Sequence, residues 1–494
     1  MSASSPAVAE PLASTGIPGL DDILHGGLAV NRLYLLEGDP GSGKTTLALQ
    51  FLLEGVAEGE RCLFVALSES GDELRATAAT HGWSLEGLDV FELVPSDESL
   101  SADGRYTMFH PSEVELNATT RLVLDEVERL SPTRLVFDSL SELRLLAQDS
   151  LRYRRQVLML KQFLARRHCT VFMVDDRTGT ATDMVLFSIA HGVVSLERHA
   201  PAYGSLRRRL LIPKMRGRRF REGYHDFRIL QGGLEVYPRL VAAEESQTAG
   251  RGTLPSGVAA LDQLMGGGLT AGTSTLIIGP AGTGKSAIAT RFAFEAAERG
   301  ERTAVFLFDE SEATYLQRAA GLGMPMKPAL EAGLLSLRRI DPAELTPGEL
   351  AHDMRDAVER DGVRVVVVDS LNGYLQAMPD EALLTVHLHE LLSYLGQQDV
   401  VTILVMAQHG MLGSQLAVPV DTTYLADAVL MLRYFEERGE VRRAISMMKK
   451  RTGAHEVTIR ELRLGAGGVS VGDPLRDLQG VLSGVPMLVG DRPA

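Results

Sequence analysis

The chain carries one glycine-rich loop pattern twice, in two matching contexts. Residues 38–45 read GDPGSGKT and residues 279–286 read GPAGTGKS. Each follows an apolar run that predicts a strand and precedes an Ala- and Leu-rich run that predicts a helix. Between a strand and a helix, such a loop can wrap an anion with its backbone N–H groups, and the helix dipole favours negative charge there. The sequence therefore predicts two phosphate-binding loops in one chain.

The last two positions of each loop indicate what it binds. In loops of this kind the lysine reaches the β and γ phosphates, and the hydroxyl that follows it binds Mg²⁺. These positions hold Lys44 and Thr45 in the first copy and Lys285 and Ser286 in the second. A nucleotide with Mg²⁺ is the expected ligand, and Thr45 and Ser286 are the expected metal-binding residues.

The loops belong to a tandem repeat with a mainly parallel sheet in each half. Strand-like and helix-like runs alternate in both halves, which predicts parallel strands with helices on both faces. A constant offset in residue number relates Gly16 to Gly257, Lys44 to Lys285 and Glu69 to Glu310. We expect a disordered start at residues 1–13, domains at 14–240 and 253–464, a linker at 241–252, and a short tail at 465–494 whose apolar segment 478–482 lies on the second domain.

Composition narrows the functional classes. With 494 residues, 45% hydrophobic and 23% charged, the chain is globular. Its net charge of −14 argues against a general nucleic-acid binder. The start lacks the basic and apolar regions of a signal peptide, no run is long enough for a membrane helix, and only two cysteines occur. We therefore expect a cytoplasmic protein without membrane contact.

Carboxylates follow the predicted strands near each loop. Asp138 and Asp369 end apolar runs, as the Mg²⁺-binding acid of a Walker B motif does. Glu69 and Glu310 follow the second strand of each repeat, where a carboxylate could orient or deprotonate the nucleophile that attacks the γ phosphate. The alternative is a solvated acidic loop or a helix N-cap. Because both repeats keep the Glu at the same offset, the catalytic interpretation is favoured.

Basic clusters stand late in each repeat. Of the 50 lysines and arginines only seven are Lys, so a lysine indicates a position that favours a compact ammonium. In both clusters an arginine precedes a lysine by the same spacing, and a second arginine follows two positions later. They could contact phosphates across a subunit interface, or they could be exposed basic strands. The clusters are Arg208, Lys214 and Arg216, and Arg443, Lys449 and Arg451.

Together these motifs resemble the KaiC family of RecA-like ATPases, over residues 14 to 486. The resemblance implies two tandem RecA-like P-loop NTPase domains, a homohexameric double ring, and ATP bound with Mg²⁺ between subunits. It further implies slow ATP hydrolysis and serine/threonine autokinase activity in the second domain. Carried over by position, Asp138 and Asp369 are the Walker B acids. Glu69, Asp309 and Glu310 match the catalytic acids, and Lys214, Arg216, Arg443, Lys449 and Arg451 the residues that reach the neighbour's ATP. The nucleotide-binding residues are Gly41, Ser42, Gly43, Lys44, Thr45 and Thr46, and Gly282, Thr283, Gly284, Lys285, Ser286 and Ala287.

The chain departs from the family pattern at three places. Ser68 replaces the first of the paired acids in the first domain. Thr423-Tyr424 stands where the clock proteins have an adjacent Ser-Thr phosphorylation pair, so Thr423 is the candidate phosphosite. The tail stops eight residues after Pro486. We therefore expect no long docking tail for a KaiA-type partner, and a circadian oscillator is not the favoured interpretation.

The sequence thus predicts a KaiC-like, ATP-hydrolysing hexamer that acts as a signalling or timing protein, with autokinase activity at Thr423. The protein partner is not identified by the sequence. The alternative is a DNA-acting RecA relative, a recombinase or helicase, which needs basic loops facing a central channel. The acidic balance of the chain argues against that alternative.

Overall fold

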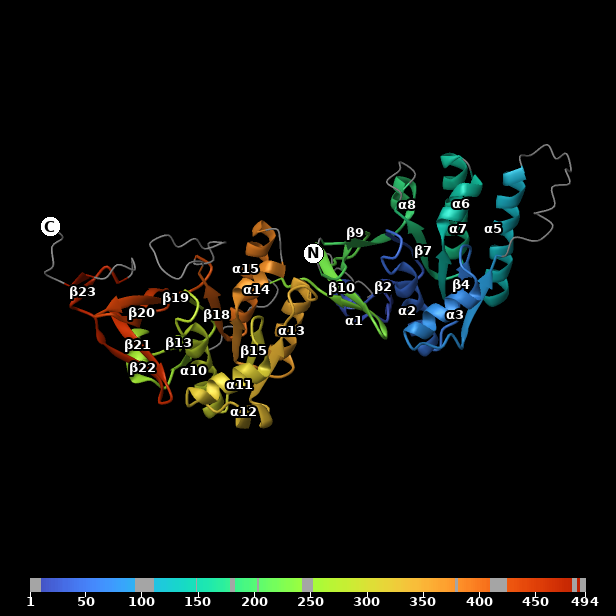
Figure 1. The fold of residues 1–494 in the computed structure, drawn as a ribbon. Coiled ribbons are helices and arrows are strands. Elements are labelled where there is room, and N and C mark those ends of the chain that lie inside the picture. The colour runs from blue at the N-terminus through green and yellow to red at the C-terminus, as the bar shows by residue number, and fades with distance from the viewer. Residues whose placement is uncertain are drawn as a thin grey trace, which may run out of the picture. The chain divides into compact units, whose positions relative to one another are not determined.

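Apolar runs form the central strands of two sheets in the computed structural model. The structure describes residues 10–93, 111–147, 149–177, 183–201, 204–241, 252–377, 381–408, 424–481 and 487–488. The chain divides into two units, Met1–Arg239 and Leu240–Ala494, and each is built around one nine-stranded sheet (Figure 1).

The first sheet has the strand order β11-β10-β9-β8-β3-β7-β6-β4-β5. The strands from β8 to β5 are parallel, and β9, β10 and β11 continue the sheet in antiparallel fashion beyond β8. Their bounds are β3 Leu33–Gly38, β4 Cys62–Ala66, β5 Leu88–Glu92, β6 Arg134–Asp138, β7 Thr170–Asp176, β8 Gly192–His199, β9 Arg207–Met215, β10 Tyr224–Leu230 and β11 Gly233–Tyr237.

The second sheet repeats this plan in the order β16-β15-β17-β18-β14-β19-β20-β21-β22. The strands from β16 to β19 are parallel, and β20, β21 and β22 are antiparallel. Their bounds are β14 Ser274–Gly279, β15 Thr303–Leu307, β16 Leu335–Arg339, β17 Val365–Asp369, β18 Val401–Ala407, β19 Ala428–Glu437, β20 Glu440–Lys450, β21 Ile459–Gly465 and β22 Gly468–Pro474.

Helices cover both faces of each sheet. Successive residues of a strand point to opposite faces, so alternate residues pack into two different cores. Tyr34 and Leu36 of β3 pack with α1, α2 and α3, whereas Leu33 and Leu35 pack with α5, α6 and α7. The second unit does the same, with α9 to α11 on one face and α13 to α15 on the other. The predicted fold class is confirmed. The helices are α1 Pro18–Ile23, α2 Lys44–Ala57, α3 Gly71–Thr80, α5 Pro111–Leu130, α6 Leu140–Ala147, α7 Ser150–Ala165, α8 Asp183–Ile189, α9 Ala259–Leu264, α10 Lys285–Glu298, α11 Glu312–Gly321, α12 Lys327–Glu331, α13 Pro347–Glu359, α14 Leu371–Ala377 and α15 Glu381–Gln397.

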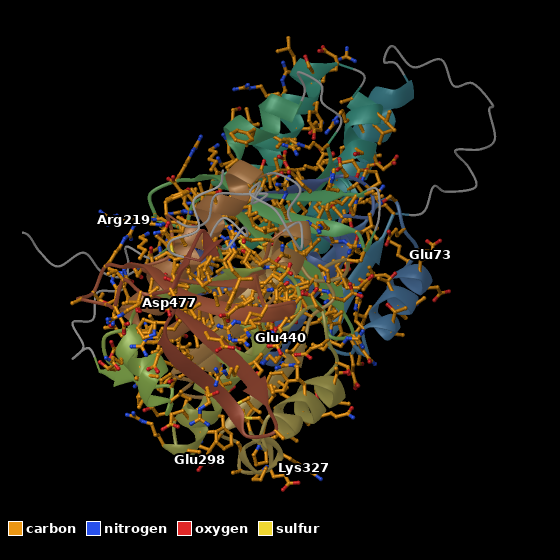
Figure 2. All side chains as sticks on the ribbon, turned by 60° about the vertical axis from the view of Figure 1, so that its left-hand side comes forward. Glu73, Arg219, Glu298, Lys327, Glu440 and Asp477 are labelled. Carbon is orange, nitrogen blue, oxygen red and sulfur yellow. The ribbon has the colours of Figure 1, made fainter. Side chains whose placement is uncertain are left out.

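Charged side chains are concentrated on the outer surface of these layers. Figure 2 shows Glu73 on α3 and Lys327 on α12 projecting from their helices into solvent. Among the described residues, no helix combines the length and apolar character that crossing a bilayer requires.

Two predicted boundaries differ from the structure. Strand β1 (Leu12–Ala13) pairs with β2 (Leu28–Ala29), so the first unit includes residues before position 14. Strand β22 pairs with β21, so the second sheet continues beyond residue 464. The glycine-rich stretch after residue 464 turns the chain between these two strands, with Gly468 at φ +96°. Val481 packs with Phe435 and Ala444, so the apolar segment of the tail lies on the second unit as expected.

A buried histidine makes the first unit sensitive to acid. The Arg239 N–H donates to His225 Nδ1 at 2.9 Å, and Nε2 donates to the Arg221 carbonyl at 3.0 Å, so the ring is neutral. Burial lowers the pKa of His225 to about 4. The unfolded chain, with an ordinary pKa near 6.5, therefore takes up a proton first as the pH falls. His225 consequently contributes stability above about pH 6.5 that is lost as the pH falls toward 4.

We expect the urea stability of the first unit to fall by up to about 1 kcal/mol per pH unit between pH 6 and 4.5 through this residue alone. His225→Gln keeps a polar side chain without that titration, and its stability should depend less on pH over the same interval. A variant whose stability falls as steeply as that of the natural chain would contradict this assignment.

Candidate nucleotide sites

Both loops have the backbone that an anion cradle requires. Each follows a central strand, β3 or β14, and each ends where a long helix, α2 or α10, begins. The residue before each helix is a glycine with positive φ, +107° at Gly43 and +101° at Gly284. A Cβ at Gly43 would lie 2.7 Å from Ile229 Cδ1, and one at Gly284 would lie 2.5 Å from Leu464 Cδ1. Only glycine therefore fits at these positions without moving a neighbour.

The two lysines are buried beneath their loops. Lys44 Nζ donates to the carbonyl oxygens of Gly38 and Asp39, each at 3.0 Å. Lys285 Nζ donates to the Pro280 carbonyl at 2.8 Å. Burial lowers the pKa of Lys285, although Asp369 and Asp309 oppose that effect. A buried ammonium at the N-terminus of a helix is suited to bind an anion.

The predicted Walker B acids lie beside the loop hydroxyls. Thr45 Oγ1 donates to Asp138 Oδ2 at 3.1 Å, and Ser286 hydrogen-bonds Asp369 in the same way. Burial raises the pKa of Asp138 and of Asp369 to about 6, although these hydrogen bonds lower it. A nearby cation would stabilise either buried carboxylate in its ionised form.

These residues fit Mg²⁺ together with a nucleotide. Mg²⁺ takes oxygen ligands and usually binds through one or two carboxylates or hydroxyls plus substrate phosphates. Within the described residues, no group of three or more His, Cys, Asp and Glu could hold a metal ion alone. Thr45 with Asp138, and Ser286 with Asp369, would therefore hold Mg²⁺ only together with phosphate oxygens.

The three predicted catalytic acids have different surroundings. Burial raises the pKa of Glu69, and Glu73 adds to the shift. Asp309 accepts a hydrogen bond from the Ser370 hydroxyl. Both carboxylate oxygens of Glu310 contact the guanidinium of Arg318. The helix caps that follow are formed by Ser70 and Ser311, so these acids are not the capping residues.

Sequence reasoning missed Arg318. It lies on α11, and its NH1 also donates to Thr290 on α10 at 3.3 Å. Comparison of the repeats does not reveal it, because the equivalent position in the first unit holds Thr77. Glu69 therefore has no counterpart of this arginine at that position.

In the second unit the site residues surround one cavity of about 430 Å³, within the range of small-ligand pockets. Its lining combines the phosphate loop with the acids at the carboxyl ends of β15 and β17. The residues that carry charge or a hydroxyl there include Lys285, Ser286, Asp309, Glu310, Arg318 and Asp369. The cavity thus brings together most of the residues predicted for this site.

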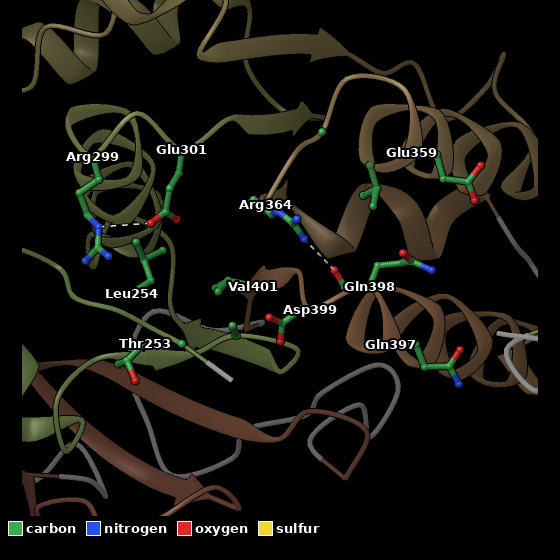
Figure 3. A pocket seen from close by; sticks show the side chains of 14 residues that line it. Thr253, Leu254, Arg299, Glu301, Glu359, Arg364, Gln397, Gln398, Asp399 and Val401 are labelled. Carbon is green, nitrogen blue, oxygen red and sulfur yellow. Dashed lines mark hydrogen bonds and ion pairs between the residues drawn. The ribbon is translucent and has the colours of Figure 1, made fainter. Parts of the chain in front are cut away.

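A larger cavity of about 680 Å³ in the second unit is not a comparable phosphate site. Figure 3 shows its two arginines, Arg299 and Arg364, each already engaged. Arg299 Nε lies 3.2 Å from Glu301 Oε1, and Arg364 NH1 donates to the Gln398 carbonyl at 3.2 Å. The cavity is lined by none of the loop residues 279–286.

Each basic cluster is spread along one antiparallel strand, β9 or β20, so that its first arginine and its lysine lie toward opposite ends of that strand. In the first unit Lys214 and Arg216 donate to carbonyl oxygens at the end of α8, including that of Ser188. In the second unit Lys449 donates to the Ala426 carbonyl at 2.7 Å, and Arg451 donates to that of Tyr424 at 2.8 Å.

Arg443 is placed differently, because its Nε donates to the Gly282 carbonyl of its own phosphate loop at 3.3 Å. The structure therefore separates Arg443 from Lys449 and Arg451, with which the sequence grouped it. Thr423 lies outside the described residues.

Comparison with known proteins agrees with this geometry. The family model described as "ATPase: KaiC" matches residues 13–241 and again residues 254–476. The "Circadian clock protein KaiC3" of Synechocystis sp. is 29% identical over 485 residues, covering 96% of this chain and 94% of that protein. The "Circadian clock oscillator protein KaiC" of Picosynechococcus sp. is 28% identical over 477 residues, covering 96% and 92%. The predicted ATPase function with ATP and Mg²⁺ is confirmed, and the chain belongs to the KaiC family of ATPases.

Proposed function

We propose that this ATPase works as a homohexamer in the cytoplasm, with ATP bound between neighbouring subunits, and that it serves as a signalling or timing switch. One observation carries the proposal. The lysines of the basic clusters lie at the end of each sheet opposite to the phosphate loop of the same unit.

The strand registers support this placement. In β20, Arg443 pairs with Tyr434 beside the unit's own loop, whereas Lys449 pairs with Val429 near the start of β19. Six residues of antiparallel strand separate them, which is about 20 Å. In β9, Arg208 and Lys214 are separated by the same number of residues, and Lys214 pairs with Val193 near the start of β8. Neither lysine can reach a phosphate at its own loop, but each could reach one on a neighbouring subunit.

This placement assigns roles to the predicted site residues. Lys44 and Lys285 would bind the phosphates of their own unit, while Lys214, Arg216, Lys449 and Arg451 would reach those of a neighbour. Arg443 would instead hold the backbone of its own loop. Bound ATP and Mg²⁺ would supply the bond to be cleaved and the cation that polarises it.

The acids would have three roles: binding Mg²⁺, activating the attacking group and positioning other side chains. Asp138 and Asp369 would hold Mg²⁺ with Thr45 and Ser286. Glu69 in the first unit and Asp309 in the second would orient or deprotonate the attacking group. Glu310 is already ion-paired with Arg318, so it would position its neighbours rather than accept the proton.

The same arrangement would make the protein a switch. Cations of one subunit that neutralise phosphates of the next would hold the ring together, and the loss of the γ phosphate would weaken those contacts. The surface offered to a protein partner would change with the nucleotide state. In the second unit, phosphoryl transfer to Thr423 would leave a covalent phosphate that persists longer than the bound nucleotide.

The test is to measure assembly and phosphate release together and to map any phosphorylated residue. We expect light scattering to show six-chain particles only with nucleotide, slow phosphate release, and label from γ-labelled ATP on Thr423. Thr423→Val should lose the label, and Thr422→Val is the matched control that should keep it. A chain that stays monomeric with saturating Mg-ATP contradicts the ring, and label that persists in Thr423→Val contradicts the phosphosite.

A further inference from the structure

One arginine in the second cavity is bound to an acid of the same cavity. Arg318 lies in the last turn of α11 and lines the cavity together with Glu310. Its Nε donates to Glu310 Oε2 at 3.2 Å, and its NH2 donates to Oε1 at 2.5 Å. The third nitrogen, NH1, donates to the Thr290 hydroxyl on α10 at 3.3 Å. All three nitrogens of the guanidinium are therefore engaged, and two of them bind the two oxygens of one carboxylate.

This pair is shielded from water. The side chain of Glu310 is 17% exposed and that of Arg318 is 25% exposed. Thr290 is buried, and the Tyr315 ring packs against the guanidinium, with its centroid 5.1 Å from the Arg318 Cζ. A guanidinium that binds both carboxylate oxygens and has these neighbours has a well-defined geometry. Glu310 is consequently held on the side of the cavity that α10 and α11 form.

The first unit lacks both this arginine and one of the two acids. Helices α3 and α11 begin and end at equivalent positions of the two repeats. The position of Arg318 holds Thr77 in the first unit, and the position of Asp309 holds Ser68. The site with two adjacent acids thus has the additional cation, and the site with one acid does not. This difference indicates that the arginine compensates for the second acid.

The remaining acid of the first unit has different surroundings. Glu69 occupies the position that Glu310 has in the second unit. Burial and the charge of Glu73 raise its pKa. The hydroxyl that orients the arginine has no counterpart either, because the position of Thr290 holds Leu49. Among the residues that the structure describes, Glu69 therefore lacks the ion pair that fixes Glu310.

We propose that Arg318 is a positioning residue that decides which acid acts at the second site. By binding Glu310, it holds that carboxylate away from the attacking group and leaves the activation to Asp309. It also offsets one negative charge of a cavity that contains Asp309, Glu310 and Asp369 and must accept the phosphates of ATP. In the first site, where the arginine is absent, Glu69 acts itself. This inference rests on the proposed function in that Asp309 and Glu69 act on the attacking group.

The test exchanges both residues of the second site for those of the first, Asp309→Ser and Arg318→Thr, singly and together. Every chain carries Glu69→Gln, so that only second-site phosphate release is measured. Asp309→Ser should lower kcat/KM by about 100-fold, because it removes the acting acid while Arg318 still holds Glu310. Arg318→Thr alone should lower kcat/KM by about tenfold, because Glu310 then lacks its partner in a cavity that binds phosphates.

The two changes together should compensate for each other. In the double variant Glu310 is released, as Glu69 is in the first unit, so kcat/KM should be at least about tenfold higher than with Asp309→Ser alone. Independent effects would instead multiply to about a 1,000-fold loss. Adding Glu310→Gln should remove the recovery. A merely structural role of Arg318 predicts no recovery, because a further loss of structure does not restore turnover.

A matched control and the possible outcomes complete the test. Arg360→Thr removes an exposed arginine directly after α13, paired with Asp356 at 2.9 Å, and should leave kcat/KM unchanged. A double variant no more active than Asp309→Ser, or a recovery that survives Glu310→Gln, overturns the role of Arg318. If the double variant does not fold, as judged by its melting curve, Arg318→Met replaces Arg318→Thr and must give the same recovery. If Asp309→Ser alone leaves turnover unchanged, the proposed role of Asp309 is wrong and this inference fails with it, which is a distinguishable result.

Discussion

Lys285→Ala is expected to abolish Mg-ATP binding at the second site, with at least about a 100-fold loss of affinity. The side chain is buried beside Ser286 and Asp369, so no other cation of the loop can take its place. Without it, the phosphates would meet Asp309, Glu310 and Asp369 with less compensation. Nucleotide-dependent assembly should weaken as well. Lys449 and Arg451 of the neighbouring subunit would lose the phosphates that they are proposed to contact.

The measurement combines calorimetric titration with light scattering at saturating Mg-ATP. Lys327→Ala is a matched control, since Lys327 is an exposed lysine on α12 that pairs only loosely with Glu331 at 3.8 Å. It should leave both affinity and assembly unchanged. Burial already disfavours the charged form of Lys285, so its removal should not unfold the unit, and a melting curve checks this. An intact hexamer of Lys285→Ala with ATP would contradict the role of the second site in assembly.

Local patterns were enough to predict the fold and the loops. The alternation of strands and helices, the glycines with positive φ and the acids at strand ends are all fixed by residues close together in sequence. The scarcity of lysine was also informative. Six of the seven lysines donate to backbone carbonyl oxygens in the structure, a task that suits a compact ammonium with three donors.

Contacts between distant residues were not predictable in the same way. The pairing of Lys44 with Asp176 depends on β7 lying next to β3, and this strand order is set by the sheet rather than by any motif. Arg318 reaches Glu310 because the last turn of α11 places it in the lining of the cavity. Arg443 and Lys449 lie apart because β20 runs antiparallel to β19, which places Arg443 beside the phosphate loop and Lys449 away from it. The sequence does not show this direction. Glycines at residues 465–468 were interpreted as a domain end, although they form a turn between two paired strands.

The trans arrangement predicts that two inactive variants restore each other when mixed. Lys449→Ala keeps its own phosphate loop but lacks the cation for its neighbour, whereas Lys285→Ala lacks the loop lysine but keeps Lys449. Each alone should lose nearly all hydrolysis at the second site, on the order of 100-fold or more. First-site turnover must be silenced in both variants by Glu69→Gln, which removes the proposed catalytic carboxylate but leaves Lys44 to bind ATP and hold the ring, so that only second-site turnover is measured.

In a ring assembled at random from equal amounts of the two variants, about a quarter of the interfaces combine an intact loop with an intact Lys449. We therefore expect phosphate release to recover to roughly a quarter of the rate of the Glu69→Gln parent. Recovery requires that both variants fold and co-assemble, which separates loss of a contact from loss of structure. If Lys449 acted within its own subunit, no chain in the mixture would hold both lysines. Mixed particles verified by light scattering that stayed inactive would then exclude the trans role.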